Sequence, residues 1–151
     1  MVEKIEGLLN AFHVTLHVEA MDAVTSNDIV LVIDTSGSMG DDSRLVNAKK
    51  AATQFINELL VPEQPLTRIA LVSFASTATR RLPFTSYDGK QSLIDAVDAL
   101  VAEGGTHTQA GINEARVLLG GSTADHKNNV LLSDGEPTYS YALNNPGKFL
   151  S

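Results

Sequence analysis

The 151-residue chain contains no cysteine and no tryptophan. The absence of cysteine excludes disulfides, thiolate zinc sites, iron–sulfur centres and a cysteine nucleophile. No apolar run is longer than five residues, which is far too short for a membrane-spanning helix. The first residues also lack a basic segment followed by an apolar core, so we expect no signal peptide within this chain.

Basic residues are scarce compared with acidic ones, at 11 against 18, and the formal net charge is −7. This balance argues against binding to nucleic-acid phosphates or to an anionic membrane surface, whereas a cation fits the sign of the charge. The length favours one domain with a buried core. With 43% hydrophobic and 19% charged residues, the composition is that of an ordinary globular protein.

Two kinds of apolar pattern predict strands. Residues 29–33 are an unbroken run of aliphatic and β-branched side chains, typical of a strand covered on both faces of a parallel sheet. Residues 69–74, which are apolar except for Ser73, predict a second buried strand. Residues 130–132 predict a shorter buried strand of the same kind. Residues 12–18 alternate apolar and polar side chains instead, which predicts a half-buried strand. Residues 77–84 mix polar and apolar side chains and predict an edge strand, with Arg80 and Arg81 protecting its exposed side.

Apolar residues at helical spacing predict helices over residues 44–60, 93–101 and 110–119. We expect Ser43 to cap the first helix, and Ile112 to face the core from the third. Helices that alternate with buried strands predict an α/β fold with a doubly wound, mostly parallel sheet. Such sheets bind ligands at the carboxyl ends of their strands, so the residues that end strands are the candidates for a site.

Side chains that carry oxygen gather at these strand ends. The first buried strand is followed by a loop that begins Asp34-Thr-Ser36-Gly-Ser38, the third helix is preceded by Thr106, and the last strand is followed by Asp134. Two carboxylates and three hydroxyls, without histidine or cysteine, suit a hard divalent cation. Mg²⁺ is favoured because it keeps water ligands and leaves room for neutral hydroxyls, with Mn²⁺ and Ca²⁺ as alternatives.

Local structural roles are the competing interpretation of the same residues. Turn or capping roles would explain Ser36 and Ser38, and a strand-ending turn would explain Asp134 before glycine. Thr106 and Gln109 have the spacing of a capping box for the third helix. No residue stands out as a general base beside the predicted cation, so we expect no enzymatic activity.

The three motifs together resemble the metal-ion-dependent adhesion site of von Willebrand factor A domains, which integrin I domains share. The resemblance runs from about Asp28 to Thr138. It implies the Rossmann-like fold of that family, and a metal held directly or through water. It also implies that a carboxylate from a protein partner completes the coordination. The implied metal-binding residues are Asp34, Ser36, Ser38, Thr106 and Asp134.

Within that family, the chain looks most like tip adhesins of Gram-positive pili and similar wall-anchored proteins. There the adhesion domain is often inserted into a stalk-like β domain. The resemblance therefore implies a leading segment with a β-strand of a flanking β domain over residues 1–27. The N-terminal portion of the adhesion domain would follow over residues 28–151. Two further strand–helix units that complete such a domain are expected to lie outside this chain.

The resemblance implies a Mg²⁺-dependent adhesion module at the cell surface or cell wall, with its signal and anchor outside this chain. Its expected ligand is a carboxylate of a host or extracellular matrix protein. A second chain segment that completes the sheet is another expected partner. The alternative is an intracellular module that assembles with an ATPase or a metal-insertion complex, as the same domain does in magnesium chelatase subunits.

Overall fold

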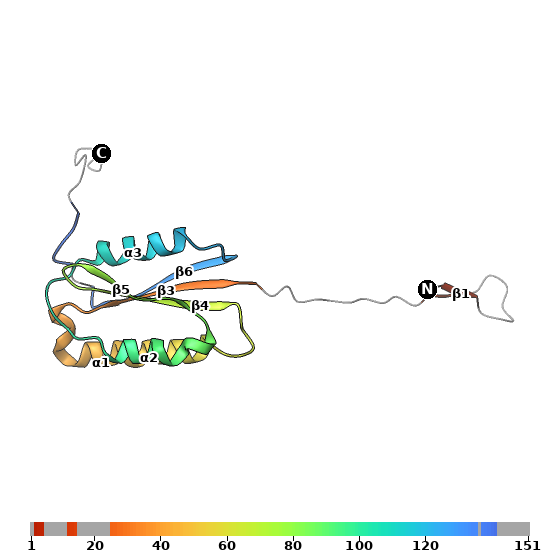
Figure 1. Ribbon diagram of the computed structural model, residues 1–151, viewed down its shortest axis with the longest axis horizontal. Helices are drawn as coiled ribbons and strands as arrows, with labels where there is room; N and C mark the ends of the chain where they lie inside the picture. The colour runs from red at the N-terminus through yellow and green to blue at the C-terminus, as the bar shows by residue number, and fades with distance from the viewer. Residues whose placement is uncertain (1, 5–11, 15–24, 136, 142–151) are drawn as a thin grey trace.

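The computed structural model describes residues 2–4, 12–14, 25–135 and 137–141, which include an open four-stranded sheet with helices on both faces (Figure 1). The strands lie in the order β5-β4-β3-β6. Three of them run parallel: β3 (Asn27–Asp34), β4 (Thr67–Phe74) and β6 (His126–Leu132). At one edge, β5 (Ala78–Thr85) pairs antiparallel with β4. The predicted α/β fold with a mostly parallel, doubly wound sheet is confirmed.

Helices α1 (Arg44–Leu59) and α2 (Lys90–Asp98) cover one face of the sheet, and α3 (Thr108–Gly120) covers the other (Figure 1). Alternate residues of a strand point to opposite faces, so the central strand supplies both cores. Leu31 and Ile33 pack on the side of α1 and α2, whereas Val30 and Val32 pack on the side of α3. This two-sided burial is the reason that β3 is aliphatic without alternation. Two short 3₁₀ segments, η1 (Gly37–Ser43) and η2 (Tyr87–Gly89), precede α1 and α2.

Several local predictions are wrong. Ile112 does not face the core, because its place on α3 leaves it 45% exposed. The second helix ends at Asp98, so Val101 lies outside it and is 69% exposed. Ser43 has a left-handed backbone (φ 61°) and makes no side-chain capping bond to α1. The strand at 130–132 is longer than predicted and largely exposed, because β6 lies at the edge of the described sheet.

The first residues form a separate small hairpin. Strand β1 (Val2–Lys4) pairs antiparallel with β2 (Phe12–Val14). The predicted strand over residues 12–18 is thus observed over its first three residues, and its remainder lies outside the described residues. The proposed domain boundary near residue 27 stays a prediction.

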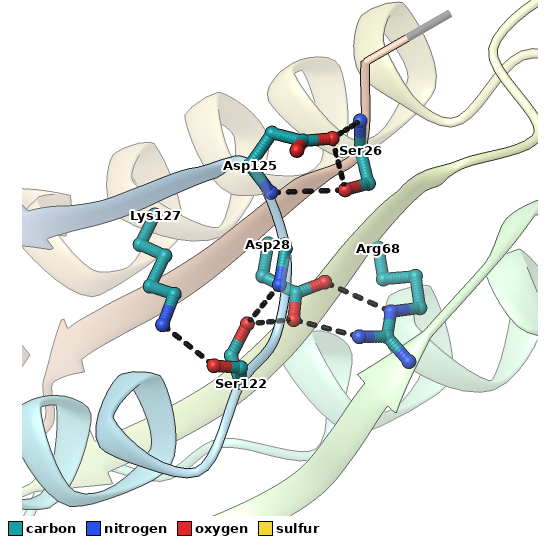
Figure 2. A network of polar contacts seen from close by, with 7 residues as sticks. Ser26, Asp28, Arg68, Ser122, Asp125 and Lys127 are labelled. Atoms are coloured by element: carbon teal, nitrogen blue, oxygen red, sulfur yellow. Dashed lines mark hydrogen bonds and ion pairs between the residues drawn. The ribbon is translucent and has the colours of Figure 1, made fainter.

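A polar network lies at the amino ends of the parallel strands (Figure 2). Asp28 is fully buried near the start of β3. Arg68 of β4 donates to its two carboxylate oxygens, from Nε over 2.8 Å and from Nη2 over 2.7 Å. Ser122 Oγ donates to the same carboxylate over 2.6 Å. The hydrogen bond to Asp28 raises the pKa of Arg68, so the guanidinium stays protonated. It thereby supplies the positive charge that the buried Asp28 carboxylate requires.

Three further hydrogen bonds in Figure 2 join Ser26, which precedes β3, to Asp125, which precedes β6. Asp125 accepts hydrogen bonds from Ser26, from the backbone N–H over 2.9 Å and from Oγ over 2.7 Å. In return, the Asp125 N–H donates to Ser26 Oγ over 2.9 Å. The backbone and side-chain bonds from Ser26 lower the pKa of Asp125, because they stabilise the ionised carboxylate. These contacts fasten the edge strand β6 to β3 at the end of the sheet opposite the predicted site.

Candidate metal centre

Asp34 is the last residue of β3, and its side chain is fully buried. Its Oδ1 accepts the Ser36 N–H over 2.8 Å, and its Oδ2 accepts Ser133 Oγ over 2.6 Å. A buried carboxylate needs such partners, because removal of a charge from water is costly. The two bonds come from different loops, so they fix the orientation of the carboxylate at the carboxyl end of the sheet.

The hydroxyls of Ser36 and Ser38 lie side by side, with 3.1 Å between their Oγ atoms. Ser36 is fully buried, and Ser38 is half-buried at the start of η1. Ser36 precedes η1 but makes no side-chain capping bond there, so the capping interpretation of this residue is not supported. The loop after β3 therefore presents two neighbouring hydroxyl oxygens next to the Asp34 carboxylate.

Backbone hydrogen bonds join the loop after β3 to the loop before α3. The Gly37 N–H donates to the Gly104 carbonyl over 2.9 Å, and the Glu103 N–H donates to the Thr35 carbonyl over 2.8 Å. The approach is close, since a Cβ on Gly37 would lie 3.2 Å from the Gly104 oxygen. Gly104 itself has φ +73°, a conformation that glycine adopts at little cost. The two loops thus form one unit.

Thr106 is buried in that unit, with 3% of its surface exposed. Its N–H donates to Thr138 Oγ1 over 2.8 Å, and its carbonyl accepts the N–H groups of Thr138 and Tyr139 over 2.8 and 3.0 Å. The capping-box alternative is not observed, because α3 has no side-chain cap and Gln109 Oε1 instead accepts the Tyr141 N–H over 2.8 Å. The segment after β6 thus lies against the Thr106 loop.

Asp134 follows β6, and its side chain is only 10% exposed. Its Oδ2 lies 3.2 Å from Nη1 of Arg44, the first residue of α1. The neighbouring Ser133 binds Asp34, so the loop after β6 is attached to the same strand end as the loop after β3. The structure therefore brings Asp34, Ser36 and Ser38 into contact and links the loops of the other two predicted ligands to them.

Sequence reasoning did not single out three residues that shape this region: Arg44, Ser133 and Thr138. Ser133 has the clearest signal, because it lies next to a predicted ligand at a strand end. The partners of Arg44 and Thr138 depend on how distant loops meet, which no local pattern encodes.

The donors of the predicted centre are all oxygen atoms. Within the described ranges, no three or more histidine, cysteine, aspartate or glutamate side chains are grouped so that they could hold a metal ion. The predicted set has two carboxylates and relies on hydroxyls for the rest, so its chemistry fits a cation that keeps water ligands, such as Mg²⁺. Binding of the metal stays a prediction.

A groove of about 440 Å³ lies beside the centre. It runs between α1 and β6, with Ala48 and Leu132 among its apolar residues and Arg44 and Asp134 among its polar ones. In the described part of the chain, no helix is long and apolar enough to cross a membrane.

Comparisons with known proteins agree with this architecture. The family model of the von Willebrand factor type A domain matches residues 28–148. The minor fimbrium subunit Mfa5 of Porphyromonas gingivalis is 37% identical over 141 residues, which are 90% of this chain and 11% of Mfa5. The chain thus spans about a tenth of the length of that relative.

Solved structures of pilus proteins are also similar. The vWF domain of the type V pili tip protein Mfa5 superposes with a TM-score of 0.75 at 35% identity, over 82% of this chain and 43% of that one. The PilB minor pilin from Streptococcus sanguinis superposes with a TM-score of 0.68 at 25% identity, over 78% of this chain and 31% of that one. The expectation that the chain looks most like tip adhesins of Gram-positive pili is not confirmed. Its identity to Mfa5 from Porphyromonas gingivalis, at 35%, is higher than its identity to PilB from Streptococcus sanguinis, at 25%.

Proposed function

Because this chain belongs to the von Willebrand factor type A domain family, we propose that it is a Mg²⁺-dependent protein-binding module for adhesion. The observation behind the proposal is that hydrogen bonds hold three loops together at the carboxyl end of the sheet: those after β3, before α3 and after β6. Asp34 has a central place among them, since its carboxylate accepts hydrogen bonds from both Ser36 and Ser133. The proposed metal-binding residues are Asp34, Ser36, Ser38, Thr106 and Asp134.

Mg²⁺, when bound, would supply a coordination position for a carboxylate of the protein partner. The chain itself supplies the other ligands and the negative charge around the ion. Asp34 and Asp134 supply two negative charges, and the hydroxyls of Ser36, Ser38 and Thr106 are neutral oxygen donors. If a water separates either aspartate from the ion, the ion keeps part of its attraction for an incoming acid. Because the chain has a net charge of −7, a bound cation would help it to attract an acidic group.

The comparisons support adhesion over the intracellular alternative. The relative with 37% identity is a fimbrium subunit, and its vWF domain is described as part of a pilus tip protein. We propose the same setting here: an extracellular adhesion domain of a pilus tip or other cell-surface protein, without enzymatic activity. The expected ligand is a host or extracellular matrix protein that offers a carboxylate.

We also propose that further polypeptide completes the sheet beside β6. This strand pairs only with β3 among the described strands, and the groove between it and α1 is partly apolar. The matched vWF domain of Mfa5 is more than twice as long as the part that this chain covers, at 43%. Amide hydrogen exchange tests this idea: β6 amides that exchange quickly in this chain should become protected in a longer polypeptide of the same protein.

Isothermal titration with Mg²⁺ and Mn²⁺ tests the metal centre. We expect saturable binding to the wild-type chain and none to Asp34→Ala. Asp34 is buried, so circular dichroism must show that this variant is folded. Ser38→Ala, which alters a half-buried hydroxyl, should lower the affinity without that complication. Glu63→Ala, at an exposed position between α1 and β4, is the matched control and should bind as the wild type does. Wild-type binding that Asp34→Ala and Ser38→Ala leave unchanged would contradict the assignment.

Adhesion is tested with surfaces coated with extracellular matrix proteins, with and without EDTA. We expect binding to at least one protein that EDTA abolishes and that added Mg²⁺ restores. Esterification of carboxylates on the coated protein should also abolish it. Binding that persists in EDTA would show that adhesion does not depend on the metal centre, and it would contradict the proposal.

A further inference from the structure

Arg44 contacts two aspartates at the rim of the proposed metal centre. Its Nη1 lies 3.2 Å from Asp134 Oδ2, and its Nη2 lies 3.6 Å from Asp42 Oδ2. The two partners differ in their surroundings, because the Asp134 side chain is 10% exposed and the Asp42 side chain is 85% exposed. The guanidinium is therefore shared between a nearly buried carboxylate and one in water.

The local backbone places Arg44 at this position. Two consecutive residues without the freedom of glycine, Asp42 and Ser43, have positive φ angles of 47° and 61°. A left-handed conformation is strained for such a residue, because its Cβ comes close to the following carbonyl oxygen. The turn brings the chain from η1 into α1, with Arg44 as the first helical residue. Its side chain is 44% exposed and has room to move outward.

We propose that Arg44 is an internal counter-cation, which competes with the divalent ion for the Asp134 carboxylate. This inference rests on the metal centre proposed above. Arg44 supplies Asp134 with a positive partner when no metal is bound. If a divalent ion were held at Asp134, the Arg44 guanidinium would be repelled from that carboxylate, which would no longer need its positive charge. Arg44 then keeps its second partner, Asp42, at the surface.

The contacts distinguish Arg44 from an ordinary surface charge. Asp34, the other carboxylate of the centre, already accepts bonds from Ser36 N–H and Ser133 Oγ, neither of which is a cation. Arg44 instead places a positive charge in direct contact with a proposed ligand, Asp134. Removal of Arg44 should therefore raise the affinity for the metal and lower the stability of the metal-free protein. A residue that only supports the fold would weaken both.

The test measures the Mg²⁺ and Mn²⁺ dissociation constants of the wild type and of Arg44→Gln by isothermal titration. We expect the dissociation constant to fall about two- to five-fold in Arg44→Gln, the range of a partly exposed ion pair. Urea unfolding in EDTA should show a lower midpoint for the same variant, since Asp134 loses its counter-charge.

Lys50→Gln is the matched control, because it removes the same charge from an exposed position of α1. Lys50 lies about 9 Å farther along the helix axis, where salt screens most of its effect on the centre. Equal effects of Lys50→Gln and Arg44→Gln would overturn the proposal, since the cause would be net charge. A weaker affinity of Arg44→Gln would also overturn it, because Arg44 would then orient Asp134 for the metal. Failure of the wild type to bind would instead refute the metal centre itself.

Discussion

Ser133 Oγ donates a hydrogen bond to Asp34 Oδ2 over 2.6 Å, and this bond joins the ends of β6 and β3. The two residues are 99 positions apart in the chain. The other oxygen of Asp34 accepts the Ser36 N–H. One buried carboxylate thus organises two of the three loops that the proposed centre requires, before any metal is considered.

Ser133→Ala should lower both stability and metal affinity. The variant leaves one oxygen of a buried carboxylate without its hydroxyl donor, and a hydrogen bond to a charged group contributes about 1.5–3 kcal/mol. We expect the free energy of unfolding, measured with urea in EDTA, to fall by an amount in this range. Ser92→Ala, at an exposed position of α2, is the control and should change stability by less than about 0.5 kcal/mol. Equal stability of Ser133→Ala and the wild type would show that the bond has no structural weight.

Arg68→Met should destabilise the fold without affecting metal binding. It removes the bidentate partner of the fully buried Asp28 and leaves Ser122 as a neutral donor. Loss of one partner of a buried ion pair costs about 3–5 kcal/mol, and we expect about 2 kcal/mol here because Arg68 is 44% exposed. Asp28 and Asp34 are separated by most of β3, about 20 Å along the strand, so the metal dissociation constant should stay unchanged.

The control for this change is Arg116→Met on α3, where the guanidinium is exposed and contacts Asn113 of the same helix. Its effect on urea unfolding should be within about 0.5 kcal/mol. A shift in metal affinity for Arg68→Met would indicate that the two ends of the sheet are coupled.

The sequence predicts the framework well because two-sided burial has a direct signature. The aliphatic runs of β3 and β4 exist because helices cover both faces, and the position of Asp34 at a strand end follows from the run in β3. Exposure at the periphery could not be predicted in the same way. Ile112 is exposed although its spacing suits an inward position, because helical spacing alone does not say which face of α3 meets the sheet.

Contacts between loops are also beyond local patterns. Arg44 meets Asp134 because α1 and the end of β6 are neighbours in space, which requires the complete strand order. Ser43 has a residue type common at helix starts, yet the tight entry from η1 gives it a left-handed backbone that prevents capping.

Gly111→Ala should be destabilising even though alanine favours helices. A Cβ at Gly111 would lie 2.6 Å from Phe74 Cδ1 and 3.0 Å from Val32 Cγ1, both in the core between α3 and the sheet. Such overpacking costs typically 1–3 kcal/mol, which exceeds the gain of up to about 1 kcal/mol in helix propensity. Thermal unfolding should therefore show a lower midpoint. Gly120→Ala is the matched control on the same helix, since nothing lies within 4 Å of its Cβ position, and its midpoint should stay equal or rise. A rise for Gly111→Ala would mean that α3 can move away from the sheet at little cost.

Asp125 should make the fold sensitive to acid. Hydrogen bonds from the Ser26 backbone and side chain lower its pKa in the folded protein below the ordinary value of 3.8. A carboxyl group with a lowered pKa stabilises the fold fully above its unfolded pKa, and this contribution is lost as the pH falls through the folded pKa. Asp125→Asn keeps the shape but has no charge to lose. We expect the wild type to have the higher urea midpoint at pH 7, because an ionised acceptor makes stronger hydrogen bonds.

The difference in midpoint between the wild type and Asp125→Asn should hold from pH 7 down to about pH 4 and then shrink as the pH falls further. Other carboxyl groups titrate in both proteins, so their contribution cancels in the difference. Glu63→Gln, at an exposed position, should show no such convergence. A difference that stays constant below pH 3.8 would show that Ser26 does not stabilise the ionised form, and the fastening of β6 to β3 would then depend on backbone pairing alone.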